Sequence, residues 1–295
     1  MDENFKSVWD RRKKLVDEAI IEEIDREKSL HSKLAESMKY SLTTGGKRLR
    51  PILLMAAADS IGANGETFLT TAVAIEMLHT YSLIHDDLPA MDNDDYRRGK
   101  LTNHKIYGES LAILAGDGLQ ALAFEVLSRE KNATDSQKVS VLKEVSHAVG
   151  MCGMVGGQAI DLDAVGKQID MKTLRKMHLG KTGALFTAAI RAGAILSNAS
   201  PIQLEDLTVY AKNFGLAFQI TDDILDITGD EQMLGKPIGS DLRNLKSTYV
   251  TLTSLSEAKK IAKESCENAI DALKNFSAKA DFLRQLAQEQ VERKK

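Results

Sequence analysis

The fold class is decided by residues 67–88, TFLTTAVAIEMLHTYSLIHDDL. Apolar side chains recur here at intervals of three and four, and they cover most of a helix circumference, as expected for a buried helix. Proline occurs only four times in the 295 residues, and none lies between Ala90 and Ser200. Strands and hairpins need turn residues about every 8–12 positions, and that punctuation is missing. The sequence therefore predicts an all-α protein.

The helices should be long and continuous. We expect them near residues 4–38, 47–61, 67–88, 110–129, 135–163, 170–196, 202–228 and 255–292. Ser200-Pro201-Ile202-Gln203 predicts one helix start, with a capping residue, a proline at the first position and a glutamine three residues on. Ser254 and Glu257 predict another. No linker or low-complexity segment divides the chain, so we expect one large helical bundle over residues 1–295.

Composition excludes several classes of protein. The chain has 39 Lys+Arg against 42 Asp+Glu, a net charge of −3, which argues against general nucleic-acid binding. Its two cysteines, Cys152 and Cys266, form no metal-type pair or disulfide framework, as is usual in a reducing compartment. Residues 1–20 are too charged for a signal peptide, and no run of 18 apolar residues occurs. We therefore expect a soluble, cytoplasmic protein without a membrane span.

Two aspartate clusters end apolar helices: residues 86–92, DDLPAMD, and residues 222–226, DDILD. In the second cluster, Asp222, Asp223 and Asp226 share one helix face, because residues three or four apart are neighbours. In the first, Asp92 would point away from Asp86 on a straight helix. Pro89 should break the helix there. The chain can then bulge and bring Asp92 back beside the end of the helix. Apolar sequence leads directly into both clusters, so a mere solvated acidic face is the less favoured reading.

Several carboxylates in one cavity require cations, since each close pair repels by about 4 kcal/mol near the surface. Oxygen ligands favour Mg²⁺ or Ca²⁺ over zinc, and no His/Cys set has zinc spacing. The Glu-x-x-His pairs of di-iron bundles and the glycine and glutamate of an EF-hand are also missing. Mg²⁺ commonly binds one or two carboxylates together with substrate phosphates. The clusters therefore predict a site for Mg²⁺ and a diphosphate.

Cationic side chains occur where a diphosphate would need them. The segment GGKRLRP, residues 45–51, combines glycines that allow close approach with Lys47 and Arg50 on one helix face. It is not a P-loop, because the spacing differs. Other cations follow the first cluster or lie at helix breaks: Arg97, Arg98, Lys181 and Lys236. As a set, they favour phosphate binding.

Three polar features have a purely structural alternative. His79 lies two turns before Asp86 and could be a hydrogen-bonded core residue. Gln219 lies on the face of Asp222 and could be a satisfied core amide. The glycines at positions 150, 153, 156 and 157 indicate close helix packing rather than a cofactor site.

These motifs resemble the trans-isoprenyl diphosphate synthases, and among them the bacterial enzymes that make farnesyl diphosphate. The resemblance runs from about residue 40 to residue 250, through GGKRLRP, DDLPAMD with RRG, KTG, FQITDDILD and GKP. It implies an all-α bundle around a central cavity, usually a homodimer, with about three Mg²⁺ per active site. The implied reaction joins isopentenyl diphosphate to dimethylallyl or geranyl diphosphate by ionisation, condensation and proton loss. One departure is Val250, since the family often has proline after Thr-Tyr.

The resemblance also implies roles for individual residues. The Mg²⁺ ligands on the allylic diphosphate would be Asp86, Asp87, Asp92 and Asp222, supported by Asp223 and Asp226. The cations on that diphosphate would be Arg97, Lys181 and Lys236. Isopentenyl diphosphate would be bound by Gly46, Lys47, Arg50, His79 and Arg98. Thr182 and Gln219 would face the developing carbocation, and we nominate no side-chain base because the released diphosphate can accept the proton.

Product length is a separate prediction. Tyr81 lies five residues before Asp86, hence about 7.5 Å deeper along the helix. A ring there should stop the growing prenyl chain, and in the family an aromatic at this place resembles enzymes that stop at fifteen carbons. Tyr81 and the adjacent Ser82 are therefore candidate chain-length residues, although Tyr81 could simply fill the core.

Three alternatives remain at this point. A sister enzyme would make the twenty-carbon geranylgeranyl product. A terpene cyclase would also have an aspartate-rich motif, but it has no need for an isopentenyl site at Lys47, Arg50 and Arg98. A non-catalytic diphosphate-binding subunit commonly lacks one aspartate motif, and both motifs are intact here.

Overall fold

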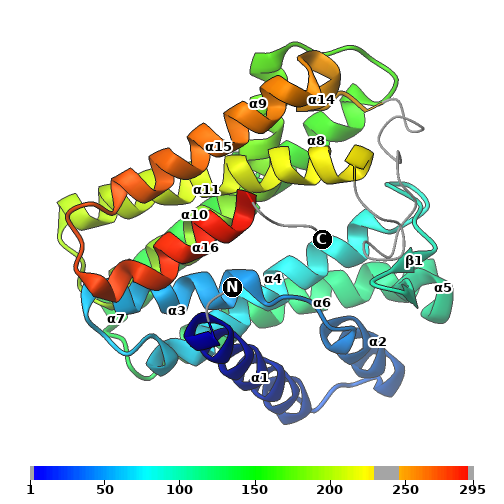
Figure 1. Cartoon of the computed structure of the whole chain (residues 1–295). Helices are drawn as coiled ribbons and strands as arrows, with labels where there is room; N and C mark the ends of the chain where they lie inside the picture. Colours follow the sequence, from blue (N-terminus) through cyan, green and yellow to red (C-terminus); the bar gives the residue numbers. More distant parts are fainter. Residues whose placement is uncertain (1–2, 229–245, 292–295) are drawn as a thin grey trace.

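The computed structural model describes residues 3–228 and 246–291, and Figure 1 shows packed helices with one short hairpin. The first half comprises α1 (Glu3–Arg26), α2 (Ser32–Thr43), α3 (Leu49–Ile61), the 3₁₀ turn η1 (Gly65–Phe68), α4 (Leu69–Asp86), β1 (Tyr96–Arg97), β2 (Lys100–Leu101), α5 (Asn103–Tyr107) and α6 (Glu109–Ser128). The second half comprises α7 (Asp135–Val149), α8 (Met154–Ala164), α9 (Met171–His178), the π-helix η2 (Leu179–Gly183), α10 (Ala184–Leu196), α11 (Pro201–Thr228), α14 (Tyr249–Leu252), α15 (Leu255–Ala272), the 3₁₀ turn η3 (Ala278–Ala280) and α16 (Asp281–Val291). The all-α prediction is confirmed.

The predicted helix starts are confirmed at the level of their hydrogen bonds. At the start of α11, the backbone N–H of Gln203 donates to the Ser200 hydroxyl. The backbone N–H of Ser200 donates to the side-chain oxygen Oε1 of Gln203. At α15, the Ser254 hydroxyl accepts from the N–H of Glu257. These contacts satisfy amide groups that a helix leaves unpaired at its first turn.

The long first helix predicted over residues 4–38 is wrong, because α1 and α2 are separate. The chain breaks where the Ser29 hydroxyl bonds the backbone of His31, which competes with helical hydrogen bonding. The His31 side chain then caps α2 by accepting from the N–H of Leu34.

Three other predicted helices are also divided. Residues 135–163 form α7 and α8, which are separated at Gly150–Gly153, where glycine disfavours a continuous helix. Residues 170–196 form α9, η2 and α10. Residues 255–292 form α15 and α16, separated by a loop that contains η3. The predicted helices do not include α5 or α14, and the β1–β2 hairpin, which pairs Tyr96 with Leu101, was not predicted.

Packing places α4 in the interior. Every residue from Thr71 to Leu78 is buried, as the apolar pattern predicts. α4 packs against α6, while α11 packs against α15 and α10 (Figure 1). The carboxyl ends of α4 and α11, which bear the aspartate clusters, are thereby anchored in separate parts of the core.

Candidate active site

The end of α4 brings Asp86 and Asp92 together. The helix stops at Asp86, and the N–H of Asp92 donates to the carbonyl of Asp86 at 2.9 Å. The bulge predicted from Pro89 is therefore confirmed. Burial raises the pKa of Asp86; the charge of Lys181 opposes this rise and the nearby carboxylate of Asp92 adds to it.

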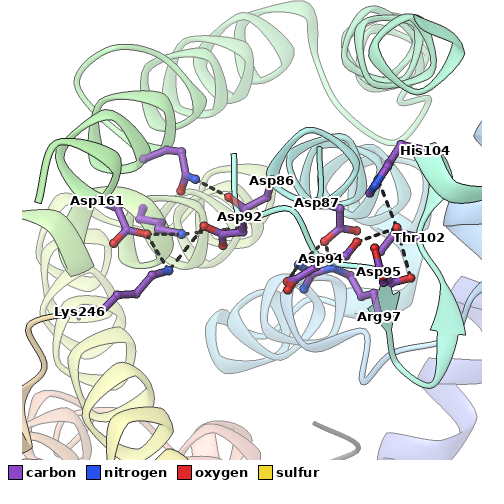
Figure 2. A network of polar contacts seen from close by, with 12 residues as sticks. Asp86, Asp87, Asp92, Asp94, Asp95, Arg97, Thr102, His104, Asp161 and Lys246 are labelled. Carbon is purple, nitrogen blue, oxygen red and sulfur yellow. Dashed lines mark hydrogen bonds and ion pairs between the residues drawn. The ribbon is translucent and has the colours of Figure 1, made fainter. Parts of the chain in front are cut away.

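Two lysines lie among these carboxylates, and Asp161 links them (Figure 2). The Lys181 ammonium lies 2.6 Å from Asp161 Oδ2 and 3.8 Å from Asp86 Oδ2. The Lys246 ammonium lies 3.5 Å from Asp92 Oδ1 and 3.6 Å from Asp161 Oδ2. Burial alone would raise the pKa of Asp161, but the charges of Lys181 and Lys246 lower it. Cations thus alternate with carboxylates across the site.

α8 supplies two of these polar groups because it lies very close to η2. A side-chain carbon at Gly157 would come within 2.0 Å of the backbone nitrogen of Lys181, so the close packing predicted from the glycines is confirmed here. On the same helix, Gln158 donates a hydrogen bond to Asp86, and Asp161 binds Lys181. Sequence reasoning missed Gln158, Asp161 and Lys246. The three-residue spacing of Gln158 and Asp161 was a signal that they share a helix face.

The π-helix η2 connects the first aspartate cluster with the second. Lys181 contacts Asp86, whereas the Thr182 hydroxyl donates to Gln219 Oε1 on α11 at 3.0 Å. The Gln219 amide in turn lies 3.5 Å from Asp222 Oδ2. π-helical turns inside α-helices are frequent at functional sites. The structure therefore links the two clusters by contacts of two consecutive residues.

The second cluster is buried unevenly. Asp222 is half-buried, whereas Asp223 and Asp226 are buried. Asp223 Oδ2 accepts from the backbone N–H of Tyr249 at 2.8 Å, which ties α11 to the start of α14. The Thr248 hydroxyl caps α14, so this segment is ordered without the proline that the family often has.

Asp87 faces away from Asp86 and belongs to a second group of charges (Figure 2). Its Oδ1 lies 2.5 Å from Arg97 Nη2 and 2.6 Å from Arg97 Nε. Burial raises the pKa of Asp87 to about 6, against the opposing effect of Arg97. Arg97 also lies 3.6 Å from Asp94. The ion pair fixes the β1–β2 hairpin, and with it Arg97 and Arg98, against the end of α4.

Arginines surround His79. Burial lowers the pKa of His79 well below its ordinary value, and the positive charges of Arg50, Arg98, Arg97 and Arg48 lower it further. The guanidinium of Arg50 lies 4.5 Å from the ring centre of Phe186, and burial lowers its pKa to about 10. Its Nε is buried and makes no hydrogen bond within the described part of the chain. A half-buried guanidinium with an unpaired Nε, beside other arginines, is a strong anion-binding feature.

The cations of the GGKRLRP segment differ in burial and in role. Arg98 donates to the carbonyl of Gly45, and a side chain at Gly46 would collide with the Arg98 guanidinium. Lys47 is exposed. Arg48, in contrast, is buried between Asp17 and Glu76 at 2.7 and 2.8 Å, which identifies a structural role.

The remaining predicted site residues lie on α4 before Asp86 or outside the described residues. Tyr81 is 4% exposed, and the Ser82 hydroxyl donates to the carbonyl of His79. Lys236 lies outside the described residues.

The donor set fits Mg²⁺. Within residues 3–228 and 246–291, no three His, Cys, Asp or Glu side chains are close enough to form a complete metal cage. The acidic groups instead offer carboxylate oxygens in pairs around the lysines. Mg²⁺ commonly takes one or two carboxylates and completes its shell with water and phosphate, and this arrangement suits that requirement.

Comparison with known proteins agrees with this geometry. The family model described as polyprenyl synthetase matches residues 31–289. This chain belongs to the polyprenyl synthetase family. It is 48% identical to farnesyl diphosphate synthase of Micrococcus luteus over 265 residues, covering 90% of each protein. It is also 48% identical to geranylgeranyl diphosphate synthase of Cyanophora paradoxa, covering 91% of this chain and 90% of that protein.

A solved structure is similar over nearly the whole chain. The FPP/GFPP synthase from Zymomonas mobilis superposes with a TM-score of 0.88 at 39% identity, covering 99% of this chain and all of that one. The polyprenyl synthetase fold is therefore shared from end to end.

Proposed function

We propose that this polyprenyl synthetase family member is an Mg²⁺-dependent prenyltransferase. It condenses isopentenyl diphosphate with dimethylallyl and then geranyl diphosphate to give farnesyl diphosphate. One observation supports this most directly: Lys181 contacts Asp86 while Thr182 contacts Gln219, which lies next to Asp222. Both aspartate clusters can therefore act on the same substrate group.

The acidic residues supply the metal site. We assign Asp86, Asp87, Asp92 and Asp222 as the principal ligands. Asp223 and Asp226 are supporting residues, and the contact of Asp223 with the backbone of Tyr249 suits that role. Bound Mg²⁺, about three ions by analogy with the family, would neutralise the diphosphate charge and assist its departure.

Cations of this chain hold the allylic diphosphate. Lys181 and Lys246 already lie between carboxylates in the structure, so their charges are directed into the site. Arg97 is held at the end of α4 by Asp87, and Lys236 is assigned to the same diphosphate by family resemblance. Positive charge positioned before the reaction stabilises the leaving group as the C–O bond breaks.

The arginine group around His79 is assigned to isopentenyl diphosphate, which binds at Gly46, Lys47, Arg50, His79 and Arg98. This supports a reaction with two diphosphates, because these cations are additional to the lysines that lie beside Asp86 and Asp161. A terpene cyclase has no use for them. Thr182 and Gln219 face the allylic cation, and their mutual hydrogen bond fixes both oxygens in place. The isopentenyl double bond attacks that cation to form the new C–C bond, and the released diphosphate then accepts the proton that is lost.

Assembly and location are part of the same proposal. Among the described helices, α6 is the one long and apolar enough by composition to cross a bilayer, and 44% of that segment is buried. Core helices of soluble proteins pass the same test. Ile113 and Leu114 are 45% and 53% exposed on α6, and a second copy of the chain would cover them. We therefore propose a cytoplasmic homodimer, each chain of which works as one domain on small diphosphates.

The experiment uses purified protein, Mg²⁺, isopentenyl diphosphate and dimethylallyl diphosphate, with products separated by length. We expect mainly the fifteen-carbon product and none after removal of Mg²⁺ with EDTA. The second candidate is a twenty-carbon product, which the similarity to the Cyanophora protein favours. Turnover with farnesyl diphosphate as the allylic substrate separates the two, and a protein that releases no diphosphate would be the non-catalytic subunit.

A further inference from the structure

The two-residue turn of the β1–β2 hairpin presents Arg98 in an unusual backbone conformation. Arg98 and Gly99 both have positive φ, 54° and 76°, as a type I′ turn requires. Glycine adopts such angles freely, whereas arginine does not, so surrounding contacts must stabilise Arg98 there. Arg98 is exposed, and its guanidinium donates to the carbonyl of Gly45. The position of this cation therefore depends on how the hairpin is held.

Thr102 closes the base of the hairpin (Figure 2). Its backbone N–H donates to the carbonyl of Asp95 at 3.0 Å, and its hydroxyl donates to the carbonyl of Asp94 at 2.8 Å. Thr102 is buried, so these bonds are shielded from water. The next residue, Asn103, begins α5 and connects the closed hairpin to the rest of the protein.

Asn103 fastens the hairpin to α2. Its Nδ2 donates to the backbone carbonyl of Ser37 at 2.9 Å and to the Ser41 hydroxyl at 2.8 Å, while its Oδ1 accepts from the Ser37 hydroxyl at 2.8 Å. Asn103 and Ser37 are 2% and 0% exposed. These bonds use both amide hydrogens and the oxygen of Asn103. The Tyr40 hydroxyl, from the same helix, donates to the carbonyl of Leu101 at 2.6 Å. α2 thus holds the end of the hairpin at adjacent points.

Because α2 also leads into Gly45, these contacts close a ring. Gly45 follows Ser41 by four residues, and Arg98 precedes Asn103 by five. The Asn103 hydrogen bonds join the two segments at one end, and the contact of Arg98 with Gly45 joins them at the other. Arg97 is restrained differently, by an ion pair with α4. Loss of the Asn103 hydrogen bonds should therefore release Arg98 and leave Arg97 in place.

We propose that Asn103 is a positioning residue for isopentenyl diphosphate: by fastening the hairpin to α2, it fixes the Arg98 guanidinium beside the segment assigned to that substrate. This inference rests on the proposed function, since it concerns one substrate of that reaction. A guanidinium that is already fixed loses less side-chain freedom when an anion binds. Asn103 acts through Arg98 and does not touch the substrate. Its effect should therefore appear in the affinity for isopentenyl diphosphate rather than in the rate of the chemical step.

The test measures steady-state kinetics of Asn103→Leu, which keeps a similar side-chain volume and removes the amide, with each substrate varied in turn. We expect the KM for isopentenyl diphosphate to rise about tenfold, the upper range for one neutral hydrogen bond. The kcat and the KM for geranyl diphosphate should change by less than about twofold. In an Arg98→Met background, Asn103→Leu should cause no further rise, because its effect passes through Arg98. Asn268→Leu is the control and should match wild type, since Asn268 is exposed on α15.

An unchanged KM for isopentenyl diphosphate in Asn103→Leu overturns the proposal. So does an equal rise in both backgrounds, because the asparagine would then act by another route. A fall in kcat with both KM values altered also contradicts it, since that pattern indicates general damage to the fold.

Ser41→Ala, which removes one of the three hydrogen bonds, provides a milder variant if the leucine protein does not fold. The expected rise in the KM for isopentenyl diphosphate is then about threefold, and no rise overturns the proposal as well. When the wild type makes prenyl product, these contrary results contradict only the role of Asn103. A wild type that makes no prenyl product contradicts the proposed function.

Discussion

Lys181 and Thr182 are adjacent in the chain, yet they contact opposite sides of the candidate active site. Lys181 binds Asp161 and approaches Asp86, whereas Thr182 donates a hydrogen bond to Gln219 on α11. The π-helix η2 presents both side chains from one short segment. This arrangement makes α10 and its preceding turn the bridge between the two aspartate-rich helices.

The first prediction concerns this bridge. Lys181→Met removes the cation between Asp86 and Asp161 and should lower kcat/KM for the allylic diphosphate by about 10- to 100-fold, the usual effect of one charged hydrogen bond. Thr182→Val should lower kcat while leaving the KM for isopentenyl diphosphate unchanged. Steady-state kinetics with each substrate varied checks both. Lys172→Met on α9 is a control, because Lys172 is outside this network. Equal effects of Lys172→Met and Lys181→Met would contradict the assignment.

The second prediction separates stability from activity at two neighbouring residues. Arg48 is buried between Asp17 and Glu76, so Arg48→Met should lower the free energy of unfolding by about 3–5 kcal/mol by leaving Glu76 unpaired. Lys47→Met, at an exposed position, should change it by about 0.5 kcal/mol or less but weaken isopentenyl diphosphate binding. Urea denaturation and substrate KM values provide the two readouts.

A further substitution checks the cause. Glu76→Gln should restore part of the stability lost in Arg48→Met, since it removes the unpaired charge. If the double variant is less stable than Arg48→Met, the ion pair is not the source of the effect.

The third prediction concerns the two thiols. Burial raises the pKa of Cys266 from its ordinary value of 9.0 to about 12, and Glu267 adds to the shift. Cys152 is exposed. At pH 8 a thiol reagent should therefore label one cysteine rapidly and the second only after unfolding. Mass spectrometry should find the first label at Cys152, and rapid labelling of Cys266 in the folded protein would disagree with the structure.

The same shift has a consequence for stability. The unfolded thiol ionises from about pH 9, whereas the folded thiol remains neutral, so the contribution is fully present below pH 9 and is lost as the pH rises toward 12. The free energy of unfolding should fall over this range, and less steeply in Cys266→Ala.

The fourth prediction tests whether the ring of Tyr81 limits product length. Tyr81→Ala removes the whole ring and should shift the main product from fifteen to twenty carbons or more. Tyr81→Phe retains the ring and should produce a smaller shift. Chromatography of the dephosphorylated products distinguishes them. Unchanged product lengths in Tyr81→Ala would mean that the ring only fills the core.

Local sequence signals predicted much of this fold because they act over a few residues. Pro89 marked the end of α4 and the return of Asp92, and Ser200 with Gln203 marked the start of α11. The break between α1 and α2 was missed because it depends on a weak local competition at Ser29 rather than on proline. The aspartate clusters could be recognised from the sequence alone, because the residues of each cluster lie within a few positions of one another.

The supporting groups of the site were less visible. Asp161 and Lys246 form an ion pair, although their positions differ by 85 in the sequence. Gln158 belongs to the site because it donates a hydrogen bond to Asp86. Arg48 lies in the same motif as Lys47 and Arg50, yet its partners come from α1 and α4. Such pairings depend on the tertiary structure, and no regular spacing in a single sequence predicts them.

The central claim is that both aspartate clusters act on one diphosphate. A double-mutant cycle of Asp86→Asn and Asp222→Asn, measured as kcat/KM for geranyl diphosphate at saturating Mg²⁺, tests it most directly. We predict that each single variant loses about 100-fold or more, and that the double variant is within about tenfold of the slower single variant, because groups that act together are not additive. Losses that multiply independently, or full activity in either single variant, would contradict the claim.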